Sequence, residues 1–169
     1  GKMKVIDMEF SFMGPFGYDL GYLAGNLISQ YASACFRPFA SEQERREFKA
    51  YLLATIKTMY HTYFDTFAAC WNKDCKERYV GQDGLRKSIL DEVLADSVGY
   101  ASMVNWFRVA SEIEYPDFDI IDNLEDRRLA KTLSLLLDWQ IMFSRYGYMS
   151  VDDLIDTILY VEEMFMKKL

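Results

Sequence analysis

The sequence has little histidine, cysteine and proline, and these shortages exclude several classes of protein. A single histidine, His61, leaves no His/Cys ligand set for a zinc site, and no serine lies in the GxSxG motif of α/β-hydrolases. The three cysteines, Cys35, Cys70 and Cys75, are an odd number without a disulfide framework. They predict a reducing compartment, and we expect the protein to be cytoplasmic.

Positive charge and long apolar runs are also scarce. The chain has 19 Lys and Arg against 26 Asp and Glu, for a net charge of −7, which argues against a nucleic-acid-binding surface. No apolar run approaches the roughly 18 residues of a membrane span, and the first residues lack a signal-peptide pattern. With 169 residues and 51% hydrophobic content, a single globular domain over residues 1–169 is expected.

The stretch VIDMEFSFMGPFGYDLG, residues 5–21, is the most informative part of the chain. Its alternation predicts a short strand, with Asp7 and Glu9 on the same face about 7 Å apart. Two carboxylates at this spacing suit a hard cation such as Mg²⁺. The alternative is that both residues simply occupy the solvated face of a half-buried strand.

A turn and a helix are expected to follow this strand. Gly14-Pro15-Phe16-Gly17 is typical of a turn, in which the glycines can adopt positive φ. Asp19 then stands where a helix begins, and it is a candidate cap or an acceptor for a neighbouring loop.

The rest of the chain predicts a mainly α protein. Helical spacing of apolar residues, capping signals at Ser41, Asn123 and Ser150, and a break at Gly99 define the expected helices. They lie at about residues 19–33, 42–71, 84–97, 100–113, 124–146 and 151–166, after a strand or hairpin element and metal motif at residues 4–18.

The order D-x-E, short strand and GPxGYDLG resembles the metal-binding segment of the aminoglycoside phosphotransferase and choline kinase class, most closely that of the 5-methylthioribose kinases. A weaker similarity extends through residues 62–72 and 96–101. The resemblance implies the helical C-terminal lobe of a protein-kinase-like fold. The positions that match the family motif are Asp7, Glu9, Gly14, Pro15, Gly17, Tyr18, Asp19 and Gly21.

The resemblance also implies an activity, the transfer of the γ-phosphate of ATP to a hydroxyl of methylthioribose or a related sugar in methionine salvage. Asp7 and Glu9 would hold Mg²⁺ against the ATP phosphates, and Asp19 would brace the catalytic loop. Trp106 and Arg108 would border the sugar. The arginine pair of the family falls at Asn105 and Trp106, so the acceptor stays open, and ordinary helix packing with a snorkelling Arg108 is the alternative.

Other parts of a phosphotransferase are not found in this sequence. It contains no Gly-rich phosphate loop, no strand lysine for the phosphates and no H-x-D catalytic loop, all of which the family places before the D-x-E. We therefore expect a C-terminal lobe portion, either a fragment or a truncated gene product, that lacks its N-terminal lobe and catalytic base and is inactive alone. Homodimerisation is a further expectation from the family.

A second hypothesis is a non-catalytic helical interaction module in which the kinase-like motif is a remnant. The 16% aromatic content and nine methionines would then serve surfaces that a partner covers.

Overall fold

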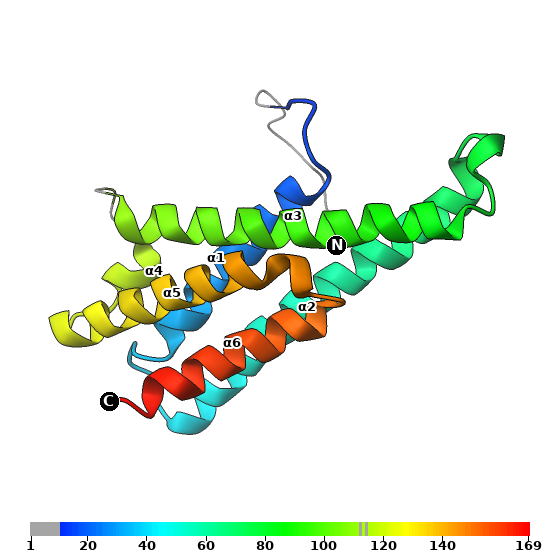
Figure 1. The fold of residues 1–169 in the computed structure, drawn as a ribbon. Helices are drawn as coiled ribbons and strands as arrows, with labels where there is room; N and C mark the ends of the chain where they lie inside the picture. Colours follow the sequence, from blue (N-terminus) through cyan, green and yellow to red (C-terminus); the bar gives the residue numbers. More distant parts are fainter. Residues whose placement is uncertain (1–10, 112, 114) are drawn as a thin grey trace.

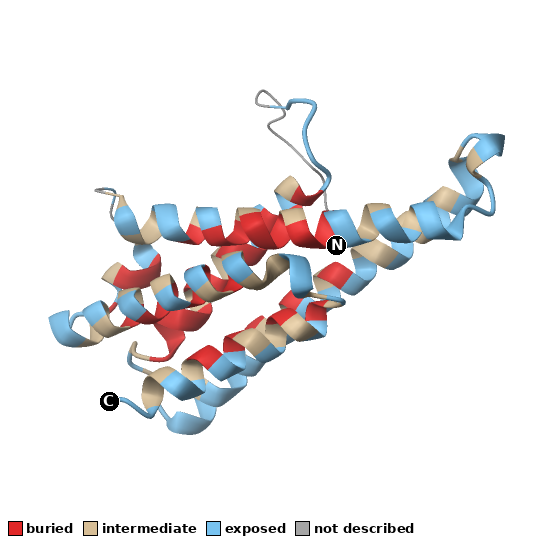
Figure 2. Ribbon diagram, viewed as in Figure 1, coloured by how far each residue is buried: buried red, intermediate tan, exposed pale blue. Residues whose placement is uncertain are grey.

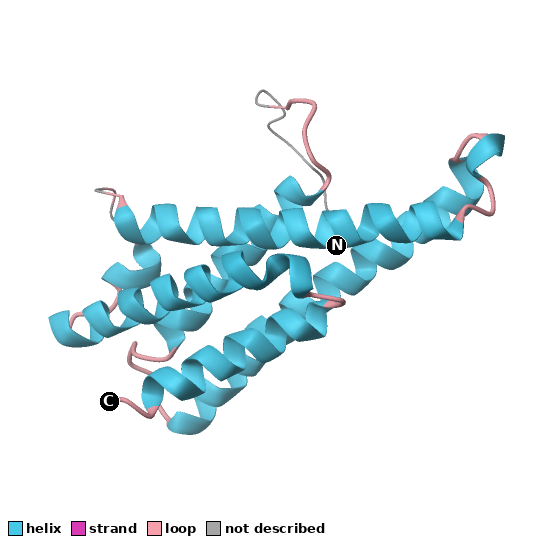
Figure 3. Cartoon of the chain, viewed as in Figure 1, coloured by secondary structure: helices cyan, strands magenta, loops and turns pink. Residues whose placement is uncertain are grey.

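The computed structural model describes residues 11–111, 113 and 115–169. These are mostly helical, with loops and turns between the helices and no strand among them (Figure 3). The main helices are α1 (Gly17–Ala34), α2 (Glu42–Asp74), α3 (Asp83–Ala110), α4 (Pro116–Asp119), α5 (Leu124–Ser144) and α6 (Val151–Met166). Two 3-10 turns, η1 (Glu77–Tyr79) and η2 (Arg145–Gly147), follow α2 and α5. The predicted mainly α class is confirmed.

The predicted strand of residues 4–18 is only partly open to comparison. Residues 4–10, with Asp7 and Glu9, lie outside the described residues. Residues 11–16 are irregular or turn, and α1 begins at Gly17, two residues before the expected helix start at Asp19. The strand itself stays a prediction.

Helix α1 lies at the centre of the structure, in contact with α2, α3, α4 and α5. Eleven of its 18 residues are buried (Figure 2), and these are mostly small or apolar. Burial of most of its surface against several helices at once is a main source of stability, although one face stays open at Asp19, Tyr22 and Leu23.

Helices α2 and α3 extend together beyond the rest of the bundle (Figure 1). The buried residues of α2 are Leu52, Ile56 and Tyr60, and its last 14 residues include none. Helix α2 therefore contributes fully buried residues only from its middle. Between α2 and α3 the chain turns at Gly81, whose φ is 76°, a conformation that favours glycine.

Capping side chains define the starts of three helices as predicted. Ser150 and Asp153 form a complete capping box on α6, and Asn123 accepts from the backbone N–H groups of Glu125 and Asp126 on α5. On α2, Ser41 accepts from the N–H of Glu44 at 3.1 Å. The Glu44 carboxylate, however, accepts from the N–H of Ala40 rather than from Ser41.

The break expected at Gly99 does not occur. Gly99 lies inside α3, so the two helices expected at residues 84–97 and 100–113 are one helix that ends at Ala110. A Cβ on Gly99 would be 3.4 Å from the Arg145 side chain. This is an ordinary van der Waals distance to a flexible side chain, so the packing does not require glycine here, and one glycine does not interrupt the helix.

Candidate functional site

The segment that follows the predicted metal ligands enters α1 through a tight turn. The Pro15 carbonyl accepts from the N–H of Tyr18 at 3.1 Å, as the predicted turn requires. Among the described glycines only Gly81 has positive φ, so neither Gly14 nor Gly17 does. The expected use of these glycines for left-handed backbone was therefore wrong.

The glycines of the motif serve close packing between helices instead. Gly17, Gly21 and Gly25 lie one turn apart on one face of α1. A Cβ on Gly17 would come within 2.7 Å of the Ser97 backbone nitrogen, and one on Gly21 within 2.3 Å of the Ser97 carbonyl oxygen. One on Gly25 would reach within 2.6 Å of the Ala101 carbonyl oxygen. Glycine at these positions lets α1 lie directly on the backbone of α3.

An aromatic cluster adds to this anchor at the start of α1. The Tyr18 ring packs edge-on against Tyr100 of α3, with 5.1 Å between centroids, and against Phe12, at 5.2 Å. These contacts hold the segment that leads into α1 against α3 at Tyr100.

Asp19 lies in the first turn of α1 and is exposed. A carboxylate there interacts favourably with the positive end of the helix dipole, and its exposure leaves it accessible to a neighbouring loop. Asp7 and Glu9 lie outside the described residues. Within the described part, no three His, Cys, Asp or Glu side chains come together as a metal site, so Asp7 and Glu9 stay the candidate ligands on sequence grounds.

Trp106 and Arg108 point to opposite sides of α3, since two residues correspond to about 200° around a helix. The Arg108 guanidinium lies 2.5 Å from the Asp117 carboxylate and over the Tyr115 ring, 4.7 Å from its centroid. Asp117 is buried and also accepts from Ser29, at 3.0 Å, and from Gln30 of α1. Arg108 is thus committed to an internal ion pair that ties α3 to α1 and α4.

Trp106 lines a groove between α3 and α5, which we call the α3–α5 groove. Its volume is about 420 Å³, and the residues that line it include Met103, Trp106, Phe107, Asp138, Trp139 and Phe143. Trp106 and Phe107 are each 55% exposed. The structure therefore places the two residues predicted to border the substrate in different surroundings, one in an open apolar groove and the other in a buried ion pair.

A buried polar chain lies beneath this groove. Asn105 donates to Oδ1 of Asp138 at 2.7 Å, and Ser134 donates to the Asn105 side-chain oxygen at 2.9 Å. All three residues are buried, and Oδ2 of Asp138 has no hydrogen-bond partner among the described residues. Burial raises the pKa of Asp138 to about 8, an effect that the hydrogen bond from Asn105 opposes.

This polar chain was missed at the level of sequence, although a signal was present. Ser134 and Asp138 are one turn apart and sit beside Leu133, Leu137 and Ile141 on the apolar stripe of α5. Polar residues that interrupt an apolar stripe at i and i+4 indicate a buried hydrogen-bonded pair or a site, because buried polar groups need partners.

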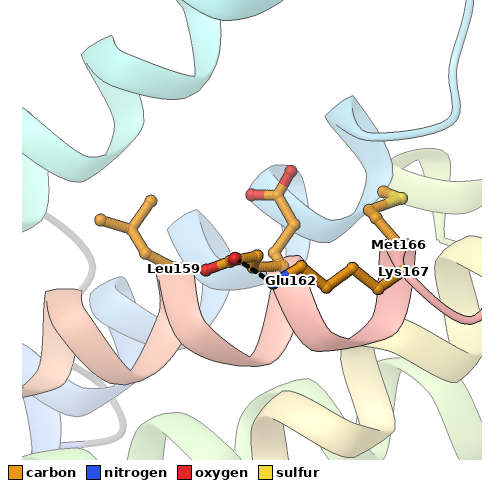
Figure 4. A pocket seen from close by; sticks show the side chains of 5 residues that line it. Leu159, Glu162, Met166 and Lys167 are labelled. Carbon is orange, nitrogen blue, oxygen red and sulfur yellow. Dashed lines mark hydrogen bonds and ion pairs between the residues drawn. The ribbon is translucent and has the colours of Figure 1, made fainter.

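A second hollow lies along α6, where it is lined by Leu159, Glu162, Met166 and Lys167 (Figure 4). The Glu162 carboxylate accepts from Lys49 of α2 and from the Tyr31 hydroxyl of α1. Burial, followed by the contact with Glu162, raises the pKa of Tyr31. Through these contacts Glu162 joins α6 to α1 and α2.

The sequence of this chain is similar to those of methylthioribose kinases from several bacteria. It is 33% identical to the enzyme of Pectobacterium atrosepticum over 134 residues, 77% of this chain and 32% of the relative. It is 32% identical to the enzyme of Geobacillus thermodenitrificans over 144 residues, which are 85% of this chain and 34% of the relative. It is 30% identical to the enzyme of Yersinia enterocolitica over 162 residues, which are 94% of this chain and 39% of the relative. No family model matches the chain. The chain spans about a third of the length of the relatives it matches.

Proposed function

Since this chain is related to methylthioribose kinases, we propose that it is the C-terminal part of an ATP-dependent kinase that phosphorylates a hydroxyl of methylthioribose or a related sugar, within methionine salvage in the cytoplasm. The similarity to these enzymes over 77–94% of the chain carries the proposal. No helix in the described part of the chain has the length and apolarity needed to cross a membrane.

In this proposal, Asp7 and Glu9 hold Mg²⁺ against the phosphates of ATP. Two carboxylates fit this ion, which is usually bound through one or two carboxylates together with substrate phosphates. When bound, Mg²⁺ neutralises charge on the phosphates during transfer. The role of the described residues is to position these ligands, since the packing of Gly17 and Gly21 on α3 anchors the segment that follows them.

The exposed Asp19 carboxylate is proposed to brace the catalytic loop of the complete enzyme. Trp106 is proposed to border the acceptor through its exposed ring. Arg108 is proposed to act there indirectly, by holding α3 against α4 through Asp117. The residue that deprotonates the acceptor is expected in another part of the enzyme, so the chain by itself is expected to transfer no phosphate.

The test is a calorimetric titration of the chain with Mg²⁺ and ATP, repeated with Asp7→Asn and Glu9→Gln. Asp122→Asn, at an exposed position outside the helices, is the matched control. We expect Asp7→Asn and Glu9→Gln to weaken binding at least tenfold and the control to leave it unchanged. A parallel assay with methylthioribose should detect no turnover.

Equal binding by all four proteins would contradict the assignment of Asp7 and Glu9. No binding by any of them would favour the alternative, a helical interaction module that keeps the motif without its chemistry. Turnover of methylthioribose by the chain alone would overturn the expectation that it is inactive.

A further inference from the structure

We propose that the outer surface of α3 and α5 is a homodimer interface, against which a second copy of this chain packs the same two helices. This surface, which we call the α3–α5 face, consists of Met103, Trp106, Phe107, Leu136, Trp139 and Phe143. The resemblance implied a homodimer without an interface, whereas this face is identified by the packing of the chain itself. The contact goes beyond the phosphotransferase activity, and it requires neither ATP nor the carboxylates of Asp7 and Glu9.

The exposed apolar residues of these two helices recur at the spacing of a helix-packing stripe. On α3 they are Met103, Trp106, Phe107 and Ala110, and on α5 they are Leu136, Trp139 and Phe143. Intervals of three, four and seven residues place side chains on one side of a helix. Apolar residues at these intervals form the seams between the helices of a bundle.

The opposite side of each helix is already used for the core. Val98 of α3 and Leu133 and Leu137 of α5 are fully buried members of the core cluster. Both helices are therefore apolar on two sides, one packed within the chain and one open to solvent. A helix that is apolar on every side is normally buried on every side, so further helices are the partner that the open side fits.

The α3–α5 face is also free of charge. Every exposed residue from Tyr100 to Ala110 of α3 and from Leu133 to Phe143 of α5 is apolar. The exposed side of α6, in contrast, carries Asp152, Asp156 and Glu163. Because the chain has a net charge of −7, two copies repel each other where acidic surfaces meet. The α3–α5 face avoids this repulsion, and its aromatic and methionine side chains are those enriched in interface cores.

The exposed area of the face matches what a stable dimer requires. The exposed fractions of its side chains range from 39% at Leu136 to 75% at Phe143. With about 150–250 Å² for a fully buried aromatic side chain, the face offers about 600–800 Å² per copy. Two copies would then bury about 1,200–1,600 Å², the size of a standard specific interface. Apolar patches on monomeric proteins are usually smaller, at about 300–600 Å².

Two-fold symmetry makes a second copy the occupant. A two-fold rotation brings the stripes of α3 and α5 in a second copy onto the same stripes in the first, so that four helices surround one apolar centre. Trp106 lies in this interface, and the acceptor site proposed beside it would then lie at the border of the two copies. Another part of the kinase on this face would instead leave the chain monomeric.

The test is the oligomeric state of the full chain, measured by sedimentation velocity from low micromolar to near-millimolar concentration without Mg²⁺ or ATP. Phe143→Glu places a carboxylate on the face, at a residue exposed enough to accept it without loss of the fold. Tyr160→Glu is the matched control, since this aromatic residue is 60% exposed on α6. Circular dichroism checks that both variants keep their helices, and NMR of the indole N–H groups locates the contact.

We expect the original chain to form a dimer as its concentration rises. Phe143→Glu should weaken the dimer at least a hundredfold, because it brings one buried carboxylate from each copy into the interface. Tyr160→Glu should form a dimer as the original chain does. Between monomer and dimer the indole signals of Trp106 and Trp139 should shift, whereas that of Trp71 should not.

A monomer at every concentration would overturn the proposal and would favour another part of the kinase as the partner of this face. A dimer that withstands Phe143→Glu would also overturn it, as would a dimer whose formation shifts the signal of Trp71 but neither of the other two. Neither Mg²⁺ nor ATP is present in these measurements, so their outcome is independent of the roles proposed for Asp7 and Glu9.

Discussion

Gly21 of α1 lies against the backbone of Ser97 on α3, so closely that a Cβ on Gly21 would be 2.3 Å from the Ser97 carbonyl oxygen. No flexible side chain separates the two residues, and relief of that contact requires a helix to move. The glycine after the aspartate of the kinase-like motif therefore has a structural role that the motif alone does not reveal.

Replacing Gly21 with alanine should destabilise the protein by about 1–3 kcal/mol or more, as overpacking of a tight core does. Urea unfolding monitored by circular dichroism measures this. Gly84 is the matched control, since it lies in the first turn of α3 with open space around its Cβ position. Gly84→Ala should be neutral or stabilise by up to about 1 kcal/mol. Equal effects of the two substitutions would contradict the packing explanation.

Removing the guanidinium of Arg108 should destabilise the fold, because it leaves the buried Asp117 carboxylate without its counter-charge. Loss of one partner of a buried pair costs about 3–5 kcal/mol, and we expect Arg108→Met to lie in or near this range. Lys87→Met removes one partner of an exposed pair with Asp91 and should cost at most about 0.5 kcal/mol. The measurement is the free energy of unfolding in urea.

The double variant Arg108→Met/Asp117→Asn should recover part of this loss, since it removes the unpaired charge. An Arg108→Met protein as stable as the original would show that the ion pair does not contribute to the fold, and would leave Arg108 free for a ligand.

Removing the Tyr60 hydroxyl should cost about 1 kcal/mol, the net contribution of a typical hydrogen bond. This hydroxyl is 2.9 Å from Oγ of Ser97, which itself donates to the Leu94 carbonyl, so the tyrosine is the donor in a buried link between α2 and α3. Tyr60→Phe should lower the urea midpoint, whereas Tyr160→Phe, at a residue 60% exposed on α6, should not. Equal midpoints for the two variants would contradict this role.

The free energy of unfolding should decrease as pH rises, because of Asp138. Its pKa is raised from 3.8 to about 8 in the folded state, so the folded protein holds this proton more tightly than the unfolded chain. The resulting stabilisation is fully present below about pH 4 and is lost as pH rises to about 8, at up to about 1.4 kcal/mol per pH unit.

Asp138→Asn removes this titration. Between pH 5 and pH 8 the original chain should therefore lose stability that the variant keeps. The free energy of unfolding of Asp138→Asn minus that of the original chain should increase over this range. Urea unfolding at pH 5, 6.5 and 8 measures the difference, with Asp156→Asn as the control expected to follow the original chain. Parallel pH profiles for Asp138→Asn and the original chain would contradict a raised pKa at Asp138.

The helices were largely predictable, because their signals are local. Apolar spacing and the caps at Asn123 and Ser150 lie within one or two turns of the structure they define, and the observed helices begin there. Gly99 misled the prediction because its low helix propensity is also local. The packing of α3 against α1 and α5, which joins distant parts of the chain, keeps the helix continuous through this glycine.

The candidate site was predictable only in part. The motif through Gly21 was recognised, but the use of its glycines for packing depends on α3, which begins more than 60 residues later. Trp106 and Arg108 were treated as neighbours at one site, whereas the helix turns them to opposite sides. Asp138 was not considered, since a lone carboxylate on a helix is usually exposed.

The sequence by itself determined the mainly α class, most helix starts and the kinship with methylthioribose kinases, since local backbone preferences and a contiguous motif carry that information. Only the tertiary structure decided that α1 lies on α3 through its glycines, that Arg108 pairs with Asp117, and that Asp138 lies buried beneath an aromatic groove. These features depend on contacts and burial between side chains from distant segments, which form only when the helices pack together.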